Sequence, residues 1–364
     1  MKILLLGEYS NLHWTLAKGL RTLGHDVVVA SDGDGFKNYR RDVDISLKNN
    51  TRIGQIKCLT SIVKSLPLLK GFDIVQLINP IFTRIHPVSP YLYRFLKKYN
   101  HKIFLGAFGN DYFYTKACLE NKIYRHSEFF VNNQPINLQA NFDLKHAWIS
   151  TYRQRLNQQI ANECNGIIAG LCEYYMAYET EYKEKLSFIP FPIDLSEIEY
   201  NQLPVPEKII FFLGINKERM EIKGLDIFLK VLKELEVKYG NQIGVHIAES
   251  IPYEEYRKRM QQAHVVLDQT YGYSVAMNGL LSLAQGKILV GNAEPEMYGM
   301  MGENSNHPIV NITPSFEDIY KKMECLIQKK NYFPEISKQG RLFVEDNHAH
   351  INIAEQYLKI WEKQ

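Results

Sequence analysis

Apolar strands and amphipathic helices alternate along the first part of the chain. Lys2–Leu6 is a continuous apolar run that ends at Gly7, the pattern of a strand buried on both faces. Leu12–Leu23 has apolar residues at helical spacing and ends at Gly24, and His25–Ala30 is a second strand-like run. A strand, a helix and a strand within about thirty residues predict a βαβ unit and therefore a parallel sheet.

The same alternation continues in two series. In the first half the pattern predicts strands at Ile74–Ile78, Lys102–Leu105, Gly166–Ala169 and Ser187–Ile189, and helices at Pro90–Tyr99, Ala147–Glu163 and Glu173–Tyr182. A stretch containing Pro190, Pro192, Pro204 and Pro206 then indicates a linker. The second series has predicted strands at Lys208–Leu213, Gly244–Ala248, Val265–Asp268 and Ile288–Val290, and helices at Gly224–Tyr239, Tyr253–Gln262, Val275–Ala284, Phe316–Lys329, Ile336–Val344 and Ile351–Lys363.

The length of 364 residues is enough for two domains, each with its own core. We predict an α/β protein with an N-terminal domain over 1–195 and a C-terminal domain over 196–345. The apolar face of the last helix needs cover, so we expect 346–364 to pack back on the first domain.

Composition and charge exclude several classes of protein. Hydrophobic residues make up 45% and charged residues 23%, and 43 Lys and Arg against 40 Asp and Glu give a net charge of +3. These values are typical of a globular protein, and no block of basic residues suggests a nucleic-acid partner. The five cysteines include no CxxC pair and indicate free thiols.

The sequence shows neither a signal peptide nor an apolar run of about 18 residues, so we expect a cytoplasmic location. The segment Leu59–Phe72 is apolar with two lysines. It fits a core helix followed by a loop. The alternative is a peripheral contact with the inner face of a membrane.

Candidate chemistry lies after the strands, because open α/β sheets bind ligands beyond the carboxyl ends of their strands. After Gly7 the next glycine is Gly19, so the glycine-rich nicotinamide or flavin fingerprint is missing, and there is no Walker A motif. The strand Lys208–Leu213 leads into a loop that could bind a diphosphate, with Gly214, Asn216, Lys217, Arg219 and Lys223. The alternative is a solvated basic loop. The next candidate stretch runs into a helix whose amides and dipole favour phosphate, and consists of Tyr271, Gly272, Tyr273, Ser274 and Val275.

Three stretches of the second half carry a family resemblance. They are Lys223-Gly224-Leu225-Asp226, Tyr271-Gly272-Tyr273-Ser274 and Leu283-Ala284-Gln285-Gly286-Lys287. Together they resemble the donor half of retaining GT-B glycosyltransferases of the glycogen-synthase-like group, also called glycosyltransferase group 1 or family four. Phe191-Pro192-Ile193-Asp194-Leu195 resembles the interdomain segment of that family, and Gly24-His25-Asp26-Val27 resembles part of its acceptor domain.

The resemblance implies two Rossmann-like domains whose parallel sheets face each other across a cleft. It implies an acceptor domain followed by a nucleotide-sugar donor domain, retention at the anomeric carbon, and no required metal or other cofactor. Asp42-Val43-Asp44 is therefore not expected to bind a metal. His348 and His350 are not expected to bind one either, because two residues at this spacing on a helix point their side chains apart.

The chain departs from the family pattern at its carboxylates. Aligning Gly286 with the family glycine places Tyr273 and Leu281 where the family has glutamates that contact the donor sugar and the ribose. Asn278, Glu249 and Ser250 are the candidates to supply the missing polar contacts. Phe108-Gly109-Asn110-Asp111 replaces a stretch in the acceptor half that begins with histidine in the family.

These residues suggest roles in sugar transfer. We expect Lys223, together with Arg219 or Lys217, to neutralise charge on a departing diphosphate. Asp111 is expected to bind an acceptor hydroxyl, so Asp111 and Lys223 are the predicted catalytic residues. The predicted acceptor-binding residues are Tyr9, Ser10, His13, Asn110 and Asp111, and for His13 a place in the core is an equal alternative.

The function expected is transfer of a hexosyl-type sugar from a nucleotide sugar to a glycan, a lipid-linked acceptor or a small molecule, as in polysaccharide biosynthesis. Two alternatives stay open. One is a GT-B relative that binds a sugar nucleotide or glycan but has lost catalysis, which the missing glutamates favour. The other is a sugar-nucleotide epimerase of similar architecture.

Overall fold

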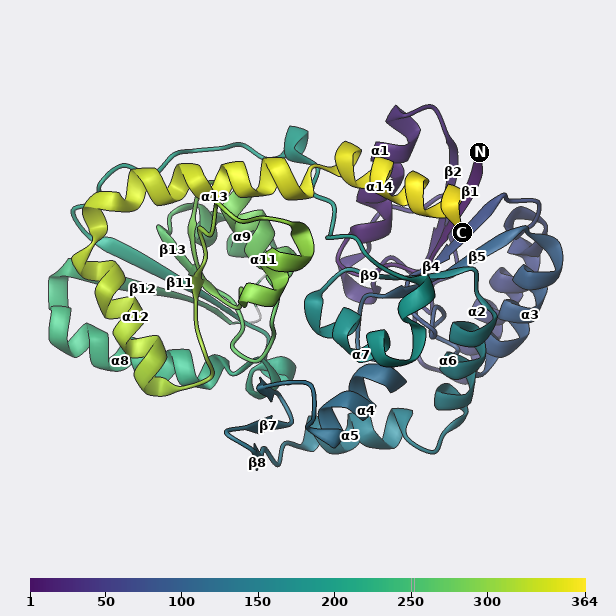
Figure 1. Cartoon of the computed structure of the whole chain (residues 1–364), viewed down its shortest axis with the longest axis horizontal. Coiled ribbons are helices and arrows are strands. Elements are labelled where there is room, and N and C mark those ends of the chain that lie inside the picture. Colours follow the sequence, from purple (N-terminus) through teal and green to yellow (C-terminus); the bar gives the residue numbers. More distant parts are fainter. Residues whose placement is uncertain (250, 252) are drawn as a thin grey trace. The chain divides into compact units, whose positions relative to one another are not determined.

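The chain forms two compact units (Figure 1). The computed structural model describes residues 1–249, 251 and 253–364. The first unit comprises Met1–Lys116, Leu144–Pro192 and His348–Gln364, and the second comprises Ala117–Asp143 and Ile193–Asn347.

The segment Ala117–Asp143 corrects the predicted domain division. The segment was predicted to belong to the N-terminal domain, but it belongs to the second unit. Its Arg125 donates its backbone N–H to the Tyr273 hydroxyl and its guanidinium to Glu294 and Glu296, about 150–170 positions further along the chain. The passage between units at Pro192 and Ile193 lies close to the predicted boundary.

A seven-stranded sheet forms the centre of the first unit, in the order β10-β9-β5-β4-β1-β2-β3, with every pair parallel. Its strands are β1 (Lys2–Leu6), β2 (Asp26–Ser31), β3 (Val43–Asp44), β4 (Ile74–Leu77), β5 (Lys102–Ala107), β9 (Gly166–Ala169) and β10 (Leu186–Phe188). The helices of this part of the chain are α1 (Leu12–Thr22), α2 (Arg52–Ser65), α3 (Ser89–Tyr99), α4 (Tyr112–Glu120), α5 (Gln139–Trp148), α6 (Tyr152–Glu163), α7 (Cys172–Tyr182) and α14 (His350–Lys363). The apolar run at the start of the chain becomes β1, whose residues 3–6 are completely buried. Helices on both faces of a parallel sheet require such continuous apolar strands.

The helix predicted over Ala147–Glu163 is interrupted. Ser150 has a left-handed backbone with φ 60, and Thr151 caps the start of α6 by accepting the N–H groups of Arg153 and Gln154. The hydroxyl of Thr151 satisfies amides that a new helix leaves unpaired, so α5 ends and α6 begins here.

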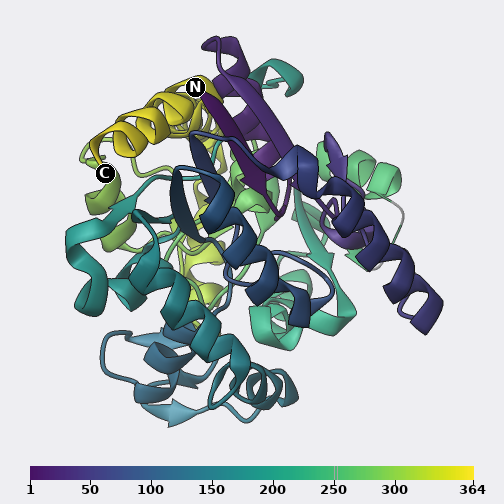
Figure 2. The same ribbon diagram turned by 90° about the vertical axis from the view of Figure 1, so that its right-hand side faces the viewer.

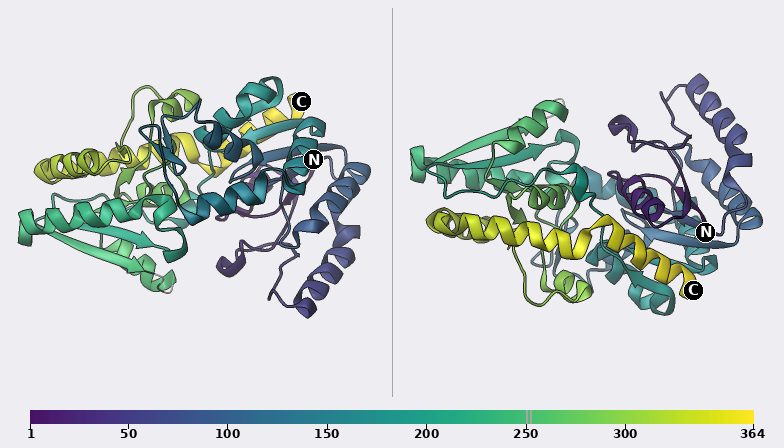
Figure 3. Two further views of the ribbon diagram at one scale, coloured as in Figure 1. Left: turned by 90° about the horizontal axis from the view of Figure 1, so that it is seen from below. Right: turned by 90° about the horizontal axis from the view of Figure 1, so that it is seen from above.

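The last helix packs on the first unit, where the sequence analysis expected it. α14 lies along α1, as Figure 1 and the right-hand view of Figure 3 show. Its buried side chains include Tyr357 and Trp361, and the Trp361 indole Nε1 lies 3.4 Å from Oε1 of Gln76. A side chain on Gly19 would overlap the His350 carbonyl, so a glycine lets the two helices approach closely.

The second unit contains a five-stranded parallel sheet, in the order β12-β11-β13-β14-β15, and a small antiparallel sheet, β6-β7-β8. The strands are β6 (His126–Ser127), β7 (Phe130–Val131), β8 (Gln134–Pro135), β11 (Ile209–Ile215), β12 (Ile243–Glu249), β13 (Val265–Leu267), β14 (Ile288–Gly291) and β15 (Val310–Asn311). The helices are α8 (Leu225–Tyr239), α9 (Tyr253–Gln261), α10 (Met277–Ala284), α11 (Pro295–Met301), α12 (Phe316–Gln328) and α13 (Phe333–His348). Aliphatic and aromatic residues from β11, α8 and α12 fill its core.

Each large sheet has one switch point, where successive strands add to opposite sides of the first strand. In the first unit β2 and β4 flank β1, and in the second unit β12 and β13 flank β11. Ligands of doubly wound sheets bind at the carboxyl ends of strands at such a point. None of the described helices is long and apolar enough to cross a membrane.

Candidate functional site

Two loops meet at the switch point of the second unit. The loop after β11 contains the short 3-10 turns Lys217–Arg219 and Glu221–Lys223, and the loop after β13 leads from Asp268 to α10. Thr270 joins them, because its backbone N–H donates to the Lys223 carbonyl at 3.0 Å and its hydroxyl lies 3.4 Å from the same oxygen. The structure therefore brings together the basic loop and the 271–275 stretch that the sequence singled out.

Gly224 allows this close approach. It has φ 64, and a Cβ there would overlap the Thr270 hydroxyl and lie 3.1 Å from the Tyr271 ring. Only a glycine adopts this backbone at low cost while leaving room for the neighbouring loop. Burial raises the pKa of Tyr271 to about 12.

Lys223 lies along the end of β13. Its ammonium is 3.9 Å from Oδ1 of Asp268, and the Lys223 side chain is 29% exposed while that of Asp268 is 5% exposed. A nearly buried carboxylate attracts the ammonium toward the strand end. The predicted contact of Lys223 with a donor diphosphate stays a prediction. Asp268 was predicted only as a strand residue and had no assigned role.

The other predicted basic residues lie on the surface. Asn216, Lys217 and Arg219 are exposed. Lys217 forms an ion pair of 3.1 Å with Glu249 in which both side chains are largely exposed, at 70% and 46%. Such a pair contributes little to stability and can be exchanged for another anion. Ser250, the other candidate beside Glu249, lies outside the described residues.

Gly214 and Asn278 both lie against the side chain of Tyr256. The Tyr256 hydroxyl donates to Oδ1 of Asn278 at 2.8 Å, and a Cβ on Gly214 would lie 2.6 Å from the Tyr256 ring. Asn278 is thus held by α9, and its carboxamide oxygen already accepts one hydrogen bond.

The amides before α10 are engaged within the protein. Gly272 N–H donates to Oδ1 of Asn292 at 2.9 Å, and Val275 N–H points to the Met297 sulfur at 3.4 Å. Ser274 is 2% exposed. The helix begins at Met277, after an extended Ala276, two residues later than predicted. Gly272 and Val275 N–H are therefore not available to a phosphate in this structure, and a phosphate contact of the first amides of α10 stays a prediction.

Tyr273 is also used internally. It is 1% exposed, and its hydroxyl accepts the backbone N–H groups of Arg125 and His126, the latter at 3.3 Å. Its ring stacks on His126 at 5.0 Å and lies 5.1 Å from the Arg125 guanidinium. Burial raises the pKa of Tyr273 and lowers that of His126. The predicted donor contact of the Tyr273 side chain is corrected, because this side chain holds the 117–143 segment.

Arg125 completes this attachment. Its guanidinium pairs with Glu296 and, at 2.8 Å, with Oε2 of Glu294, whose side chain is 8% exposed. The second oxygen of Glu294 is buried without a hydrogen-bond partner among the described residues. Sequence reasoning missed Arg125 and Glu294, and the only signal was the acidic Glu294-Pro295-Glu296 sequence at the start of α11.

At the switch point of the first unit, Glu8 and His13 are buried. The Glu8 carboxylate accepts the N–H groups of His13 at 3.1 Å and Trp14 at 3.0 Å, which caps α1, and burial raises its pKa to about 8. Nδ1 of His13 donates to the Gly7 carbonyl at 2.8 Å, and burial lowers the pKa of His13 to about 3. Of the two alternatives for His13, the structure shows the core histidine.

Tyr9 and Ser10 keep exposed surface in the same loop. The Ser10 N–H donates to Asp34 at 3.0 Å, and the Lys37 ammonium donates to the Ser10 hydroxyl at 3.2 Å. Arg84 pairs with Asp32 beside them. Asp32 and Asp34 organise the polar surface around Ser10.

Asn110 and Asp111 differ in accessibility. Asn110 is partly exposed and accepts the Tyr174 hydroxyl at 3.1 Å. Asp111 is completely buried, with Oδ1 accepting Tyr114 N–H at 3.0 Å and Oδ2 accepting the Tyr178 hydroxyl at 2.6 Å. Burial raises the pKa of Asp111 to about 6. The expectation that Asp111 faces a ligand is therefore corrected to a position that caps α4.

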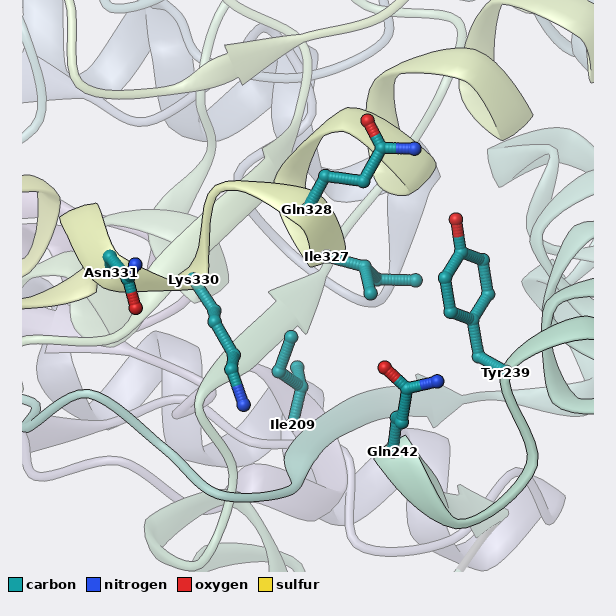
Figure 4. Close-up of a pocket in the computed structure, with 7 residues that line it drawn as sticks. All are labelled: Ile209, Tyr239, Gln242, Ile327, Gln328, Lys330 and Asn331. Atoms are coloured by element: carbon teal, nitrogen blue, oxygen red, sulfur yellow. The ribbon is translucent and has the colours of Figure 1, made fainter.

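A separate pocket of about 220 Å³ lies at the amino end of β11 (Figure 4). Its lining residues are Ile209, Tyr239, Gln242, Ile327, Gln328, Lys330 and Asn331. Ile209 is the first residue of β11, so this pocket is at the opposite end of the sheet from the switch point and is not the candidate donor site.

The side chains that resembled metal ligands have other partners. Asp42 pairs with Arg21 at 2.6 Å, and Asp44 pairs with Arg41 at 2.9 Å. Among the described residues, no three His, Cys, Asp or Glu side chains gather as a metal site.

Solved structures identify the fold. The chain is similar to sucrose-phosphate synthase from Thermosynechococcus elongatus, with a TM-score of 0.65, 11% identity, and coverage of 100% of this chain and 98% of that chain. It is also similar to Anabaena HepE in complex with UDP and glucose, with a TM-score of 0.62, 11% identity and coverage of 100% and 99%. WaaG, a glycosyltransferase involved in lipopolysaccharide biosynthesis, has a TM-score of 0.56, 13% identity and 99% coverage of both chains.

These similarities confirm the predicted fold class, an α/β GT-B fold with two Rossmann-like parallel-sheet domains. No protein-family model matches the chain, and no curated protein sequence matches it.

Proposed function

We propose that this protein is a glycosyltransferase that uses a nucleotide sugar as donor and transfers the sugar to an acceptor hydroxyl. The GT-B likeness extends over the whole chain, and one of the similar structures, HepE, was solved with UDP-glucose. The observation that carries the proposal is the switch point of the second unit. There the exposed cations of the 216–223 loop lie at the carboxyl end of the sheet, next to the 271–275 stretch.

The residues of this loop suit a diphosphate. Lys217 and Arg219 are exposed, and the anion of a donor can replace Glu249 as the partner of Lys217. Lys223 is nearer the strand end, where the bond between the anomeric carbon and the diphosphate would break. Negative charge on the leaving diphosphate grows as this bond breaks, so a lysine there stabilises the transition state more than the bound donor.

On the acceptor side we propose Tyr9, Ser10 and Asn110 as the contacting residues, because they keep exposed surface at the switch point of the first unit. Glu8, His13 and Asp111 shape the loops that carry them. Retention at the anomeric carbon is part of the proposal and is read from the anomeric configuration of the product by NMR.

Isothermal titration calorimetry with UDP and other nucleoside diphosphates tests the donor site. Lys223→Ala is expected to weaken binding about ten- to a hundredfold, the range that a charge-assisted hydrogen bond gives, and to lower turnover further. Lys230→Ala is the matched control, since Lys230 is a 68% exposed lysine on α8 that pairs with Asp226. Equal diphosphate affinity in the two variants, with unchanged melting temperature, would contradict the role of Lys223.

A second candidate is a nucleotide-sugar binding protein without catalysis. It is favoured by Tyr273, which stands at a motif carboxylate position and is buried under the 117–143 segment. Calorimetric binding of a nucleotide diphosphate, with no release of diphosphate across a broad panel of donors and acceptors, would support this candidate over the transferase.

A further inference from the structure

Helix α2 of the first unit has apolar side chains on its core face and on its exposed face. Its buried positions are Gly54, Cys58, Ile62 and Ser65. Its exposed apolar side chains are Ile53, Ile56, Leu59 and Val63, with exposures of 67%, 63%, 43% and 56%. The spacings of three, three and four residues between these side chains place them in one stripe along the helix.

One further apolar side chain is exposed just beyond the helix. The 3-10 turn Leu66–Leu69 follows α2 directly, and in it Leu68 is 59% exposed. Figure 2 shows α2, in indigo, on the outside of the first unit. Single exposed apolar residues are ordinary on a protein surface, whereas four on one helix face, with a fifth in the turn that follows, indicate a surface that binds something.

The charge around the stripe has one sign. The segment 45–72 contains five basic residues and no Asp or Glu, although the whole chain is nearly balanced at 43 against 40. The basic residues are Lys48, Arg52, Lys57, Lys64 and Lys70. Lys57 and Lys64 are exposed and are seven residues apart, so they lie on one side of the helix, along the edge of the stripe, where Ile53 stands one turn before Lys57.

We propose that α2 and the Leu66–Leu69 turn form a peripheral docking surface for an anionic lipid bilayer. The apolar stripe would enter the boundary between headgroups and acyl chains, while the lysines beside it contact anionic headgroups. A protein partner could also cover an apolar stripe. The uniform positive rim favours a surface of uniform negative charge. This inference is independent of the donor site, which is in the other unit.

Vesicle co-sedimentation tests the proposal with the full chain. Phosphatidylcholine vesicles are compared with phosphatidylcholine vesicles that contain phosphatidylglycerol. We expect binding to the anionic vesicles only, with loss at high salt because surface charges are then screened. Ile56→Ser with Val63→Ser should abolish binding, and Lys57→Gln with Lys64→Gln should weaken it about twenty-five-fold, taking about fivefold for each lysine.

The matched control is on α8, where Val237 is 84% exposed and Lys233 is exposed. Val237→Ser with Lys233→Gln should bind vesicles like the unchanged chain. All these positions are exposed, so melting temperatures and calorimetric donor binding should not change. Equal binding to both vesicle types, no binding to either, or equal loss in the α8 control would overturn the proposal. So would a change of oligomeric state in Ile56→Ser with Val63→Ser without any vesicle binding, since the stripe would then be an interface between copies.

Discussion

The switch points of the two sheets use their polar side chains in opposite ways. In the first unit the acidic and histidine side chains, Glu8, His13 and Asp111, point into the protein and hold helix starts and loops. In the second unit the loop after β11 exposes Lys217 and Arg219 to solvent. Both positions follow parallel strands, so strand order alone does not decide which side chains a ligand can reach.

The difference separates residues that shape a site from residues that can bind a ligand. A buried carboxylate that accepts two hydrogen bonds is costly to remove, because its partners lose their acceptor. An exposed cation in a weak surface pair is cheap to remove and easily changes partner. Substitutions of Glu8, His13 and Asp111 should therefore affect stability, and those in the loop after β11 should affect ligand binding.

The largest expected effect is a pH dependence of the first unit. Burial raises the pKa of Glu8 from 4.5 to about 8, so folding favours the protonated carboxyl group. Its contribution to stability is complete below pH 4.5 and is lost as the pH rises to about 8. The loss is on the order of 4–5 kcal/mol by linkage. The Glu8→Gln side chain cannot ionise, so this loss of stability with rising pH should be absent in the variant.

Tryptophan fluorescence reports this unit alone, since Trp14, Trp148 and Trp361 all belong to it. Urea unfolding of the unchanged chain and of Glu8→Gln is followed at several pH values, and the difference between the two isolates Glu8 from other groups. Parallel pH profiles for the two proteins would show that Glu8 stays ionised in the folded state.

The next effect concerns Asp111. Asp111→Ala removes the acceptor of Tyr114 N–H and of the Tyr178 hydroxyl, so the free energy of unfolding should fall by about 3 kcal/mol. Asn110→Ala, at a partly exposed neighbour, should cost about 1 kcal/mol by the same fluorescence measurement. If both variants lose only a small and equal free energy of unfolding, Asp111 is not a structural residue and is again a candidate for contact with an acceptor.

Arg125 tests the attachment of the 117–143 segment. Arg125→Ala leaves the nearly buried Glu294 without its cation and should weaken the attachment by about 1–2 kcal/mol, a value reduced by the exposure of Arg125. Amide exchange over 126–135 should become faster. Lys122→Ala is the control, because that side chain is 75% exposed and its ion pair is long. Unchanged amide exchange in Arg125→Ala would mean that the contact between Tyr273 and His126 is enough to hold the 117–143 segment in place.

Two glycines with left-handed backbones allow two effects on stability to be compared. One is the strain of placing a side chain on such a backbone, and the other is the overlap of that side chain with a neighbouring loop. Gly224 has φ 64 and no room for a Cβ, whereas Gly302 has φ 71 and open space around it. Gly302→Ala should cost about 1 kcal/mol, and Gly224→Ala about 1–2 kcal/mol more because the loops must move apart. Calorimetric melting measures both. Equal losses of stability in the two variants would show that Thr270 moves away from a side chain at position 224 at little energetic cost.

The architecture followed from the sequence because parallel strands leave a local signal. Continuous apolar runs such as Lys2–Leu6 and the Pro-bearing linker near Pro192 are visible without any tertiary contact. The basic loop was also found locally, since Lys217, Arg219 and Lys223 follow a strand. A strand and the loop after it lie within a few residues, so hydrophobic pattern and composition suffice to identify them.

What the sequence did not reveal depends on distant partners. Asp111 is buried because Tyr178 reaches it from 67 residues away, and Tyr273 is covered because Arg125 lies 148 residues earlier. The 117–143 segment joins the second unit through contacts of this kind, and no local pattern of apolar residues in its sequence indicates which unit it joins. Accessibility of a polar residue is a tertiary property, so sequence reasoning names candidate residues more reliably than it sorts ligand contacts from structural ones.

The smallest effect on stability, and the sharpest test of the comparison, is expected at Lys217. Its ion pair with Glu249 is exposed on both sides, so Lys217→Ala should change the free energy of unfolding by less than about 0.5 kcal/mol. If the exposed loop binds a diphosphate, the same variant should weaken UDP binding several-fold, because one cation near the phosphates is lost. Lys230→Ala, also an exposed lysine with a nearby carboxylate, should leave both quantities unchanged. A stability loss at Lys217 without a loss of affinity would mean that Lys217, like Glu8 and His13 in the first unit, serves the fold and not the ligand.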